Sequence, residues 1–338
     1  MDKRDKRVCE ELDYGMKKIN SWYKKNIKSL SILTIPFNSS LLFEDILLDV
    51  IRRKEKVIYI WGKNGEIKGL IDKLKLKKRN ITYGYTEDGS CDCDIMFINY
   101  KNITKVKKIY NLAIFDDVSA YSHLSKYNLK GAYEYTLEIS YKSILYTVES
   151  VIPIGEQFQL TNIDKLIPFI EPRIITTRID LNKDIPFALY DYLKWFRDEK
   201  KRVVILVPDK DKLDIAYDYY TDKLKMEKVK VIKYSKNDEK KYINNGLKIK
   251  DKAIFIITDY MEVSLEELKI EEVVVLFADS NKFNYKKLIY LCGNISRLKS
   301  GKSEVLFVSK DISREMEITK DMAREFNKRI WERKSMNF

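Results

Sequence analysis

Short apolar runs rich in β-branched residues alternate with segments of helical period along the chain, and this alternation constrains the fold most. The strand candidates of the first half are Ser31–Ile35, Val57–Trp61, Ile81–Tyr85, Ile95–Ile98, Leu112–Phe115 and Ser143–Thr147. Those of the second half are Val203–Val207, Val229–Lys233, Ala253–Ile257, Val273–Leu276 and Glu304–Val308. Between the strands, apolar residues recur on one helical face, as they do from Leu42 to Ile51. This pattern predicts α/β units built on mostly parallel sheets.

The length of the chain and one proline predict two domains. A chain of 338 residues is long enough for two domains with a core each. Pro172 cannot donate a hydrogen bond inside a sheet, so the boundary is expected beside it, giving domains 1–170 and 171–338. In the last segment, Ile312 to Glu332, Met316, Met322, Phe326 and Ile330 share one stripe. This stripe predicts an amphipathic C-terminal helix that packs on the second domain.

The composition permits an anionic partner without requiring one. Apolar residues make up 45% of the chain, which excludes general disorder. Lys and Arg number 64 against 51 Asp and Glu, for a net charge of +13, so nucleic acid is a plausible partner. Lysine, isoleucine, asparagine and tyrosine are all abundant, as AT-rich coding would produce, and that alone raises the charge.

The N-terminus and the cysteines favour a cytoplasmic protein. The start of the chain is polar and charged, which predicts no signal peptide, and no apolar run is long enough to span a bilayer. The four cysteines form no CxxC pair, and Cys91 and Cys93 alone are too few for a zinc site. A reduced cytoplasmic protein without zinc is the simplest interpretation.

Two adjacent carboxylates, Asp116 and Asp117, follow the apolar strand Leu112–Phe115. In a nucleoside triphosphatase, the acid that holds magnesium lies at the end of such a strand. Paired acids after a strand also occur by chance, where they are only a hydrated strand end. The presence or absence of a phosphate loop upstream decides between the two interpretations.

The joint between the first strand and the first helix, residues 35–41, lacks the chemistry of a phosphate loop. Such a loop needs glycines that let backbone N–H groups curl around phosphate, and a lysine that neutralises it. This joint has neither, and Pro36 removes one further donor. Asn38, Ser39 and Ser40 occupy the positions where nucleotide would be held. The sequence therefore predicts a degenerate nucleotide site, with ATP-Mg²⁺ as the only cofactor to consider.

Several motifs together resemble the ComFA family of late-competence DNA-import ATPases, which are helicase-like motors of superfamily 2. The stretch Asp116–Tyr121 is similar to that family's DEVDAF magnesium motif, and residues 31–41 are similar to its phosphate-loop segment, with Ser40 at the lysine position. Residues 143–150 fall where the family carries its Thr-Ala-Thr motif. The resemblance extends over nearly the whole chain. It implies two tandem RecA-like domains, but the family's N-terminal four-cysteine zinc module has no counterpart.

The second domain continues the resemblance. Residues 257–264 look like the family's TTTILERG stretch and retain Thr258. The family's arginine motif expects a glutamine and two Gly-Arg pairs, whereas this chain has Tyr290, Gly293-Asn294 and Ser296-Arg297. Asp116, Asp117 and Arg297 are therefore expected as vestiges of a catalytic site. In such motors the lysine, the loop amides, the acid and the arginines act together on the transferred phosphoryl group.

A helicase-like protein that has lost ATP hydrolysis can still bind nucleic acid. Helicase-type grooves hold the nucleic-acid strand mainly through charge and through hydrogen bonds to its backbone. By position in the resemblance, the candidates are Lys63 and Asn64 after the second strand and Thr258 in the second domain. Each could equally be an ordinary loop residue.

These observations predict a ComFA-like, two-domain helicase fold that binds single-stranded DNA or protein partners in DNA uptake or processing, without robust ATP turnover. Two alternatives stay open. One is a divergent but active DNA-dependent ATPase that recovers phosphate binding by other residues. The other is an interaction scaffold that binds neither nucleotide nor DNA.

Overall fold

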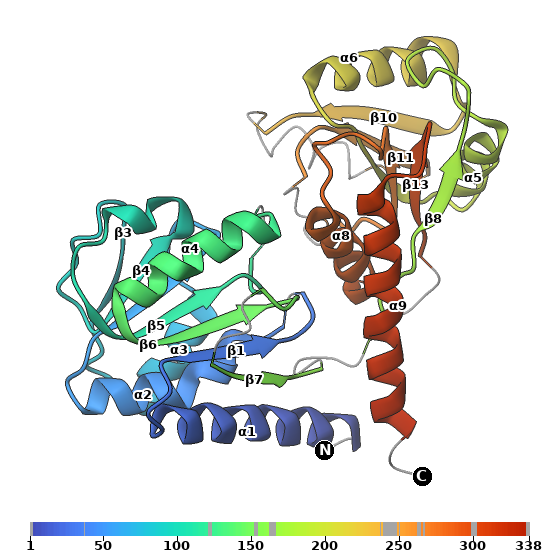
Figure 1. Cartoon of the computed structure of the whole chain (residues 1–338). Helices are drawn as coiled ribbons and strands as arrows, with labels where there is room; N and C mark the ends of the chain where they lie inside the picture. The colour runs from blue at the N-terminus through green and yellow to red at the C-terminus, as the bar shows by residue number, and fades with distance from the viewer. Residues whose placement is uncertain are drawn as a thin grey trace. The chain divides into compact units, whose positions relative to one another are not determined.

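The structure is a computed structural model that describes residues 3–36, 38–120, 124–151, 155–161, 167–236, 238, 249, 251–261, 265, 268–298 and 303–335. The chain divides into two compact units, unit 1 (Met1–Leu166) and unit 2 (Ile167–Phe338). Each contains one sheet of parallel strands (Figure 1). The α/β fold with two parallel sheets is therefore the one that the alternating pattern predicts.

Unit 1 is a seven-stranded parallel sheet with the order β3-β4-β2-β5-β6-β1-β7. Its strands are β1 (Ser29–Leu33), β2 (Val57–Trp61), β3 (Tyr83–Thr86), β4 (Ile95–Asn99), β5 (Tyr110–Asp116), β6 (Ser140–Thr147) and β7 (Glu156–Gln159). Its helices are α1 (Lys3–Tyr23), η1 (Ser40–Phe43), α2 (Glu44–Arg52), α3 (Lys68–Lys77), η2 (Tyr100–Lys105) and α4 (Lys126–Glu138). Every residue of β2 and β4 is buried, as expected for central strands covered on both faces.

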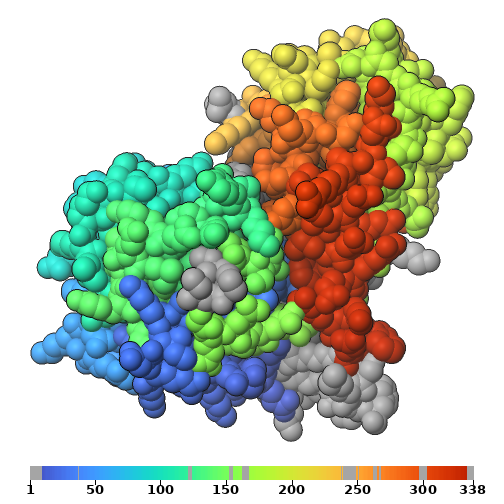
Figure 2. All heavy atoms as spheres, in the orientation of Figure 1, coloured from blue at the N-terminus to red at the C-terminus, as the bar shows by residue number. Residues whose placement is uncertain are grey.

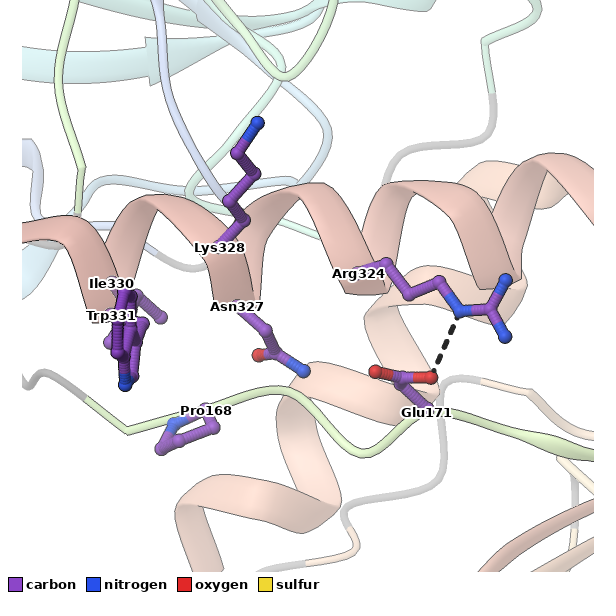
Figure 3. Close-up of a pocket in the computed structure, with 7 residues that line it drawn as sticks. All are labelled: Pro168, Glu171, Arg324, Asn327, Lys328, Ile330 and Trp331. Carbon is purple, nitrogen blue, oxygen red and sulfur yellow. Dashed lines mark hydrogen bonds and ion pairs between the residues drawn. The ribbon is translucent and has the colours of Figure 1, made fainter.

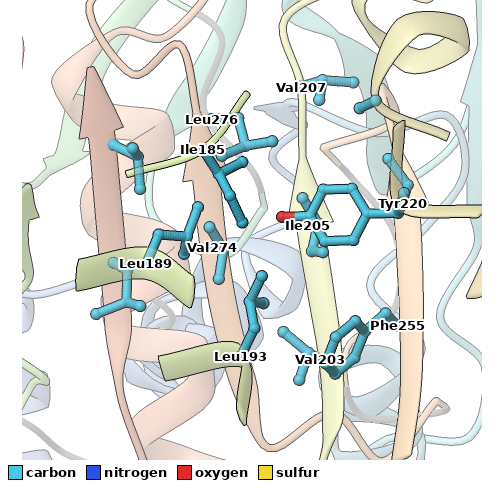
Figure 4. Close-up of a cluster of buried hydrophobic side chains, with 14 of the residues drawn as sticks. Ile185, Leu189, Leu193, Val203, Ile205, Val207, Tyr220, Phe255, Val274 and Leu276 are labelled. Carbon is cyan, nitrogen blue, oxygen red and sulfur yellow. The ribbon is translucent and has the colours of Figure 1, made fainter. Parts of the chain in front are cut away.

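Unit 2 is a six-stranded parallel sheet with the order β10-β11-β9-β12-β13-β8. Its strands are β8 (Arg173–Thr176), β9 (Arg202–Leu206), β10 (Val229–Tyr234), β11 (Ala253–Thr258), β12 (Glu272–Leu276) and β13 (Val305–Ser309). Its helices are α5 (Phe187–Asp198), α6 (Lys210–Asp218), η3 (Tyr219–Lys223), α8 (Tyr285–Leu298) and α9 (Arg314–Ser335). One face of the sheet packs against α5 and α6 through a core that includes Leu193, Ile205, Tyr220 and Phe255 (Figure 4).

The predicted amphipathic C-terminal helix is α9, part of which lies on the surface (Figure 2, red). Its buried stripe consists of Met316, Thr319, Ala323, Phe326 and Ile330. Met322 lies beside this stripe and is only partly buried.

Near its end, α9 holds the first residues of unit 2. The Asn327 side chain accepts from Phe169 N–H at 2.6 Å and donates to Phe169 C=O at 2.9 Å. Beside this clamp lies a hollow of about 410 Å³ that Trp331 and an Arg324–Glu171 ion pair border (Figure 3).

Three elements are not apparent from the apolar pattern of the sequence. Helix α1 buries positions 11, 15, 19 and 22, but Glu11 and Gly15 occupy two of them, so its apolar stripe is broken. The two short strands β7 and β8 lie at sheet edges, where half-exposed polar residues are tolerated.

Candidate nucleotide site

The carboxyl ends of β1, β5 and β6 bring the predicted vestigial site together in unit 1. These strands are adjacent, with Asp116 opposite Tyr146 and Leu33 opposite Thr147 in the register. Beyond the last paired residues, Thr34 N–H donates to Thr147 C=O and Asp117 N–H donates to Tyr146 C=O, each at 2.9 Å. The loop after β1 and the two acids therefore lie together at the carboxyl-terminal ends of the strands, as a nucleotide site requires.

The Asp116 carboxylate is buried and held by unit 1's own donors. The Tyr59 hydroxyl donates to Asp116 Oδ2 at 2.5 Å. The N–H groups of Val118 and Ser119 donate to Oδ1 at 2.9 and 2.8 Å. Burial raises the pKa of Asp116 above its ordinary value, although these hydrogen bonds oppose the rise. The same burial raises the pKa of Tyr59, and the charge of Asp116 raises it further.

Tyr59 itself was missed by the sequence analysis. It lies in the middle of the apolar run Val57–Trp61, where its ring stacks within an aromatic group that includes Phe43 and Phe97. The hydroxyl of a tyrosine in a fully buried strand usually needs a hydrogen-bond partner. This requirement is the feature of the sequence that could have pointed to Tyr59. The partner is Asp116. In a magnesium-binding site, this carboxylate would have to be accessible to the metal ion.

The loop that replaces the phosphate loop is closed by Asn38, whose side chain is buried. Asn38 Nδ2 donates to Thr34 Oγ1 at 2.6 Å and to Thr161 C=O at 2.8 Å, and Asn38 Oδ1 accepts from Ser39 N–H at 2.9 Å. Ser39 Oγ in turn accepts from Leu41 N–H at 3.2 Å. Two of the backbone donors that a phosphate would need are thus engaged by the loop's own side chains.

Segments distant in sequence support this closed loop. Thr34 Oγ1 also donates to Thr161 C=O at 3.0 Å, and Glu11 Oε1 of α1 accepts from Thr161 N–H at 2.6 Å. Helix α1 approaches η1 closely at Gly15, where a Cβ atom would lie 2.5 Å from Leu42 Cδ1. The sequence alone could not predict this role for Glu11 or Thr161. Both lie outside any motif, and their contacts are more than a hundred residues away in the chain.

The first turn of α2 also disfavours a bound phosphate. The N-terminus of a helix attracts anions, but here Glu44 and Asp45 occupy the first turn and already complement the helix dipole. Glu44 is largely buried and pairs with Lys77 at 2.9 Å. Ser40, at the position where the ComFA resemblance places lysine, is also buried. A polyphosphate would face carboxylates in place of a lysine.

The nucleic-acid candidates of unit 1 lie at the carboxyl end of β2. Lys63 and Asn64 are both exposed. Asn99, at the end of β4 and nearly buried, donates to Asn64 Oδ1 at 3.0 Å and so orients that side chain. Asn99 is an addition to the predicted set, since the strand pattern ends one residue before it.

The candidates of unit 2 lie on different elements. Thr258, the last residue of β11, is fully buried, and its Oγ1 accepts from Tyr260 N–H at 3.0 Å. Arg297 lies in the last turn of α8, and its side chain is outside the described residues, as are Tyr121 of the acid motif and residues 262–264 of the family-like stretch.

One expectation for the cysteines is wrong. Reduced cysteines were expected, but Cys91 and Cys93 form a disulfide, with their Cα atoms 5.7 Å apart, whereas Cys292 is free and buried. Within the described ranges, no three His, Cys, Asp or Glu side chains are grouped as metal ligands would be. None of the helices described there combines the length and the hydropathy that a bilayer span needs.

The fold resembles solved helicases. The DEAD-box helicase Mss116 bound to ssRNA and UDP-BeF matches 92% of this chain and 73% of its own chain, with 13% identity and a TM-score of 0.54. A deletion form of Mss116p bound to ssRNA and AMP-PNP matches the same shares at a TM-score of 0.53. The chain has the tandem RecA-like fold of helicases.

A match of lower similarity is the SWI2/SNF2 ATPase core of Sulfolobus solfataricus in complex with dsDNA, at 10% identity and a TM-score of 0.38 over 89% of this chain and 87% of that chain. No model of a known protein family matches the chain. No curated protein matches it either.

Proposed function

We propose that this chain is a ComFA-like helicase-fold protein that binds single-stranded DNA, or partners in DNA uptake and processing, without robust turnover of ATP. The observation that carries the proposal is the closed loop after β1. Asn38 and Ser39 occupy the N–H groups that would otherwise receive phosphate, and Asp116 is enclosed by Tyr59 and two backbone donors.

The helicase fold supports a role with nucleic acid. Within the fold, Lys63 and Asn64 remain exposed at the carboxyl edge of unit 1, and Asn99 leaves the Nδ2 donor of Asn64 free to contact a phosphate. Thr258 is fully buried, so in unit 2 we propose the backbone beside Thr258 as a contact, and not its hydroxyl. These contacts involve one formal charge, so their contribution to affinity is small.

A thermal-shift titration with ATP-Mg²⁺ separates this proposal from the divergent ATPase. No change in Tm at millimolar ATP-Mg²⁺ is the expected result, with EDTA in place of magnesium as the control. A reproducible, magnesium-dependent rise of a few degrees would favour an active nucleotide site instead.

Fluorescence anisotropy of a labelled single-stranded oligonucleotide tests the binding role. We expect saturable binding at low salt that weakens steeply as salt rises, because phosphate contacts release counterions. Absence of binding at low salt would leave the scaffold as the remaining function.

A further inference from the structure

The segments that lead into the strands of unit 1 carry a concentrated positive charge. Four of them, residues 24–28, 52–56, 75–79 and 107–108, are here called the basic edge. Lys or Arg occupies most of their positions, and Glu55 is their only acidic residue. Because all seven strands are parallel, these segments lie together at the amino-terminal edge of the sheet, the tails of the strand arrows in Figure 1.

Three of the four segments lie at the entries to β1, β5 and β2 in the middle of the sheet, whereas Asp92, Asp94 and Glu138 lie at the entries to β4 and β6. Strands β2, β5, β6 and β1 are successive neighbours, so their entries span about 15 Å at the usual spacing of about 4.8 Å. Contacts join these entries. Asn111 N–H donates to Lys56 C=O at 3.0 Å, and Lys142 Nζ donates to Ile27 C=O at 2.8 Å.

Part of this charge is neutralised within unit 1, and part is available. Lys25 pairs with Glu156, Arg53 with Asp49, Lys56 with Asp92, and Lys77 with Glu44. Six other cations of the basic edge are exposed and have no carboxylate within 4.0 Å among the residues that the structure describes: Lys24, Lys28, Arg52, Lys54, Arg79 and Lys108. Unpaired cationic side chains that lie close together repel one another, and binding of an anionic polymer would relieve that repulsion.

The opposite edge of the same sheet has the reverse charge. The segments that follow the strands contain Glu66, Glu87, Asp88, Asp117 and Glu149, against the cations Lys63 and Lys101. A lysine-rich composition would supply cations to both edges. The helix dipole favours cations only within the last turn, yet Lys28, Lys54 and Lys108 lie beyond any helix end. Composition and helix capping therefore do not by themselves explain why the positive charge lies at the amino-terminal edge of the sheet.

Two further features make the basic edge suitable for a flexible nucleic acid. Tyr141 is 65% exposed and Ile109 is 59% exposed, at the adjacent entries to β6 and β5. An exposed aromatic ring among cations is a platform on which an unpaired base can stack.

We propose that the basic edge of unit 1 is a binding surface for single-stranded nucleic acid, on the opposite side of the sheet from the candidate nucleotide site. Lys24, Lys28, Arg52 and Lys108 contact phosphates along this surface, and Tyr141 stacks a base. The identity of the ligand as nucleic acid rests on the proposed function, whereas the location of the surface rests on the charge distribution.

Two variants of equal charge test the location by anisotropy with a labelled single strand across a salt series. The first changes the basic edge (Lys24→Gln, Arg52→Gln, Lys108→Gln). The matched control changes three exposed lysines on or near the other edge that have no ion pair among the described residues (Lys68→Gln, Lys101→Gln, Lys126→Gln). We expect the basic-edge variant to lose at least about tenfold in affinity at low salt and to lower the salt slope by about 2, at 0.7 per phosphate contact. The control should lose less than about threefold, and circular dichroism verifies that both variants fold.

The outcomes separate the two proposals. Equal losses in both variants, or a larger loss in the control, would overturn the basic edge while leaving nucleic-acid binding intact. A wild-type protein that binds no single strand at low salt would overturn both. In a parallel arm with phosphatidylserine vesicles, retention on vesicles without any binding of oligonucleotide would assign the surface to a membrane and reject the proposal. Tyr141→Ala should weaken binding of the oligonucleotide but not of inorganic polyphosphate, since only the former has bases to stack.

Discussion

The hydroxyl of Tyr59, on β2, donates to the Asp116 carboxylate, at the end of β5, at a distance of 2.5 Å in the core of unit 1. In a working triphosphatase this acid faces magnesium. Here it faces a tyrosine from the neighbouring strand, with two backbone N–H groups on its other oxygen. The acid is buried and forms part of the hydrogen-bonded packing at this end of the sheet.

Tyr59→Phe is expected to destabilise unit 1. The substitution keeps the ring but leaves one buried carboxylate oxygen without its donor, which costs about 1–3 kcal/mol. Urea unfolding at pH 7 measures the loss, and Tyr127→Phe is the control because Tyr127 is 85% exposed. Equal stability of the two variants would mean that the Tyr59 hydroxyl contributes nothing to the native state.

Asp116→Asn is expected to gain stability relative to the wild type as pH rises. Burial raises the folded-state pKa of Asp116 above its ordinary 3.8, so the folded state binds the proton more tightly than the unfolded state. Wild-type stability therefore falls as pH rises from 3.8 through the folded pKa, and then this contribution is constant. Asparagine cannot ionise, so the variant avoids this fall.

Urea unfolding of both proteins between pH 4 and pH 8 measures the difference. It should grow with pH in favour of Asp116→Asn and level off above the folded pKa. A difference that is independent of pH would show that Asp116 does not titrate differently in the folded state.

Asn38→Ala is expected to open the closed loop at a cost of about 1–3 kcal/mol, because Ser39 N–H loses its acceptor and Thr161 C=O loses one of its two donors. It should not restore a response to ATP-Mg²⁺ in a thermal shift, since the lysine and the glycines of a phosphate loop are still missing. Asn80→Ala, at an exposed position, is the control for the stability change. ATP-dependent stabilisation of Asn38→Ala alone would show that Asn38 is an inhibitory plug over a functional site.

Gly293→Ala is expected to destabilise unit 2 by about 1–3 kcal/mol through overpacking. An added Cβ would lie 2.5 Å from Phe169 Cε1, and the Phe169 ring is itself packed against Phe326 with centroids 5.1 Å apart. Gly131→Ala, in helix α4 with no atom within 4 Å, should instead gain roughly 0.5–1 kcal/mol from helix propensity.

A double-mutant cycle with Phe169→Leu tests the cause of the Gly293 effect. The smaller, more flexible side chain should recover part of the loss. Additive effects of the two substitutions would contradict direct contact as the reason for glycine at this position.

The sequence by itself determined most of the strands, the α/β fold with parallel sheets, the C-terminal helix and the absence of glycine and lysine from the loop after β1. These features depend on local patterns: apolar runs, helical period, and the presence or absence of glycine and lysine at a joint. Edge strands β7 and β8 and helix α1 escaped prediction because half-buried elements carry polar residues in part of their contact positions.

Only the tertiary structure decided which residues contact Asn38 and Asp116 and where the positive charge is concentrated. Asn38 meets Thr161 across 123 residues, and Tyr59 meets Asp116 across 57, so no local pattern contains these pairs. The basic edge arises in the same way. Its segments are scattered through residues 24–108, and they form one surface because parallel strands bring all their entries to the same side of a sheet.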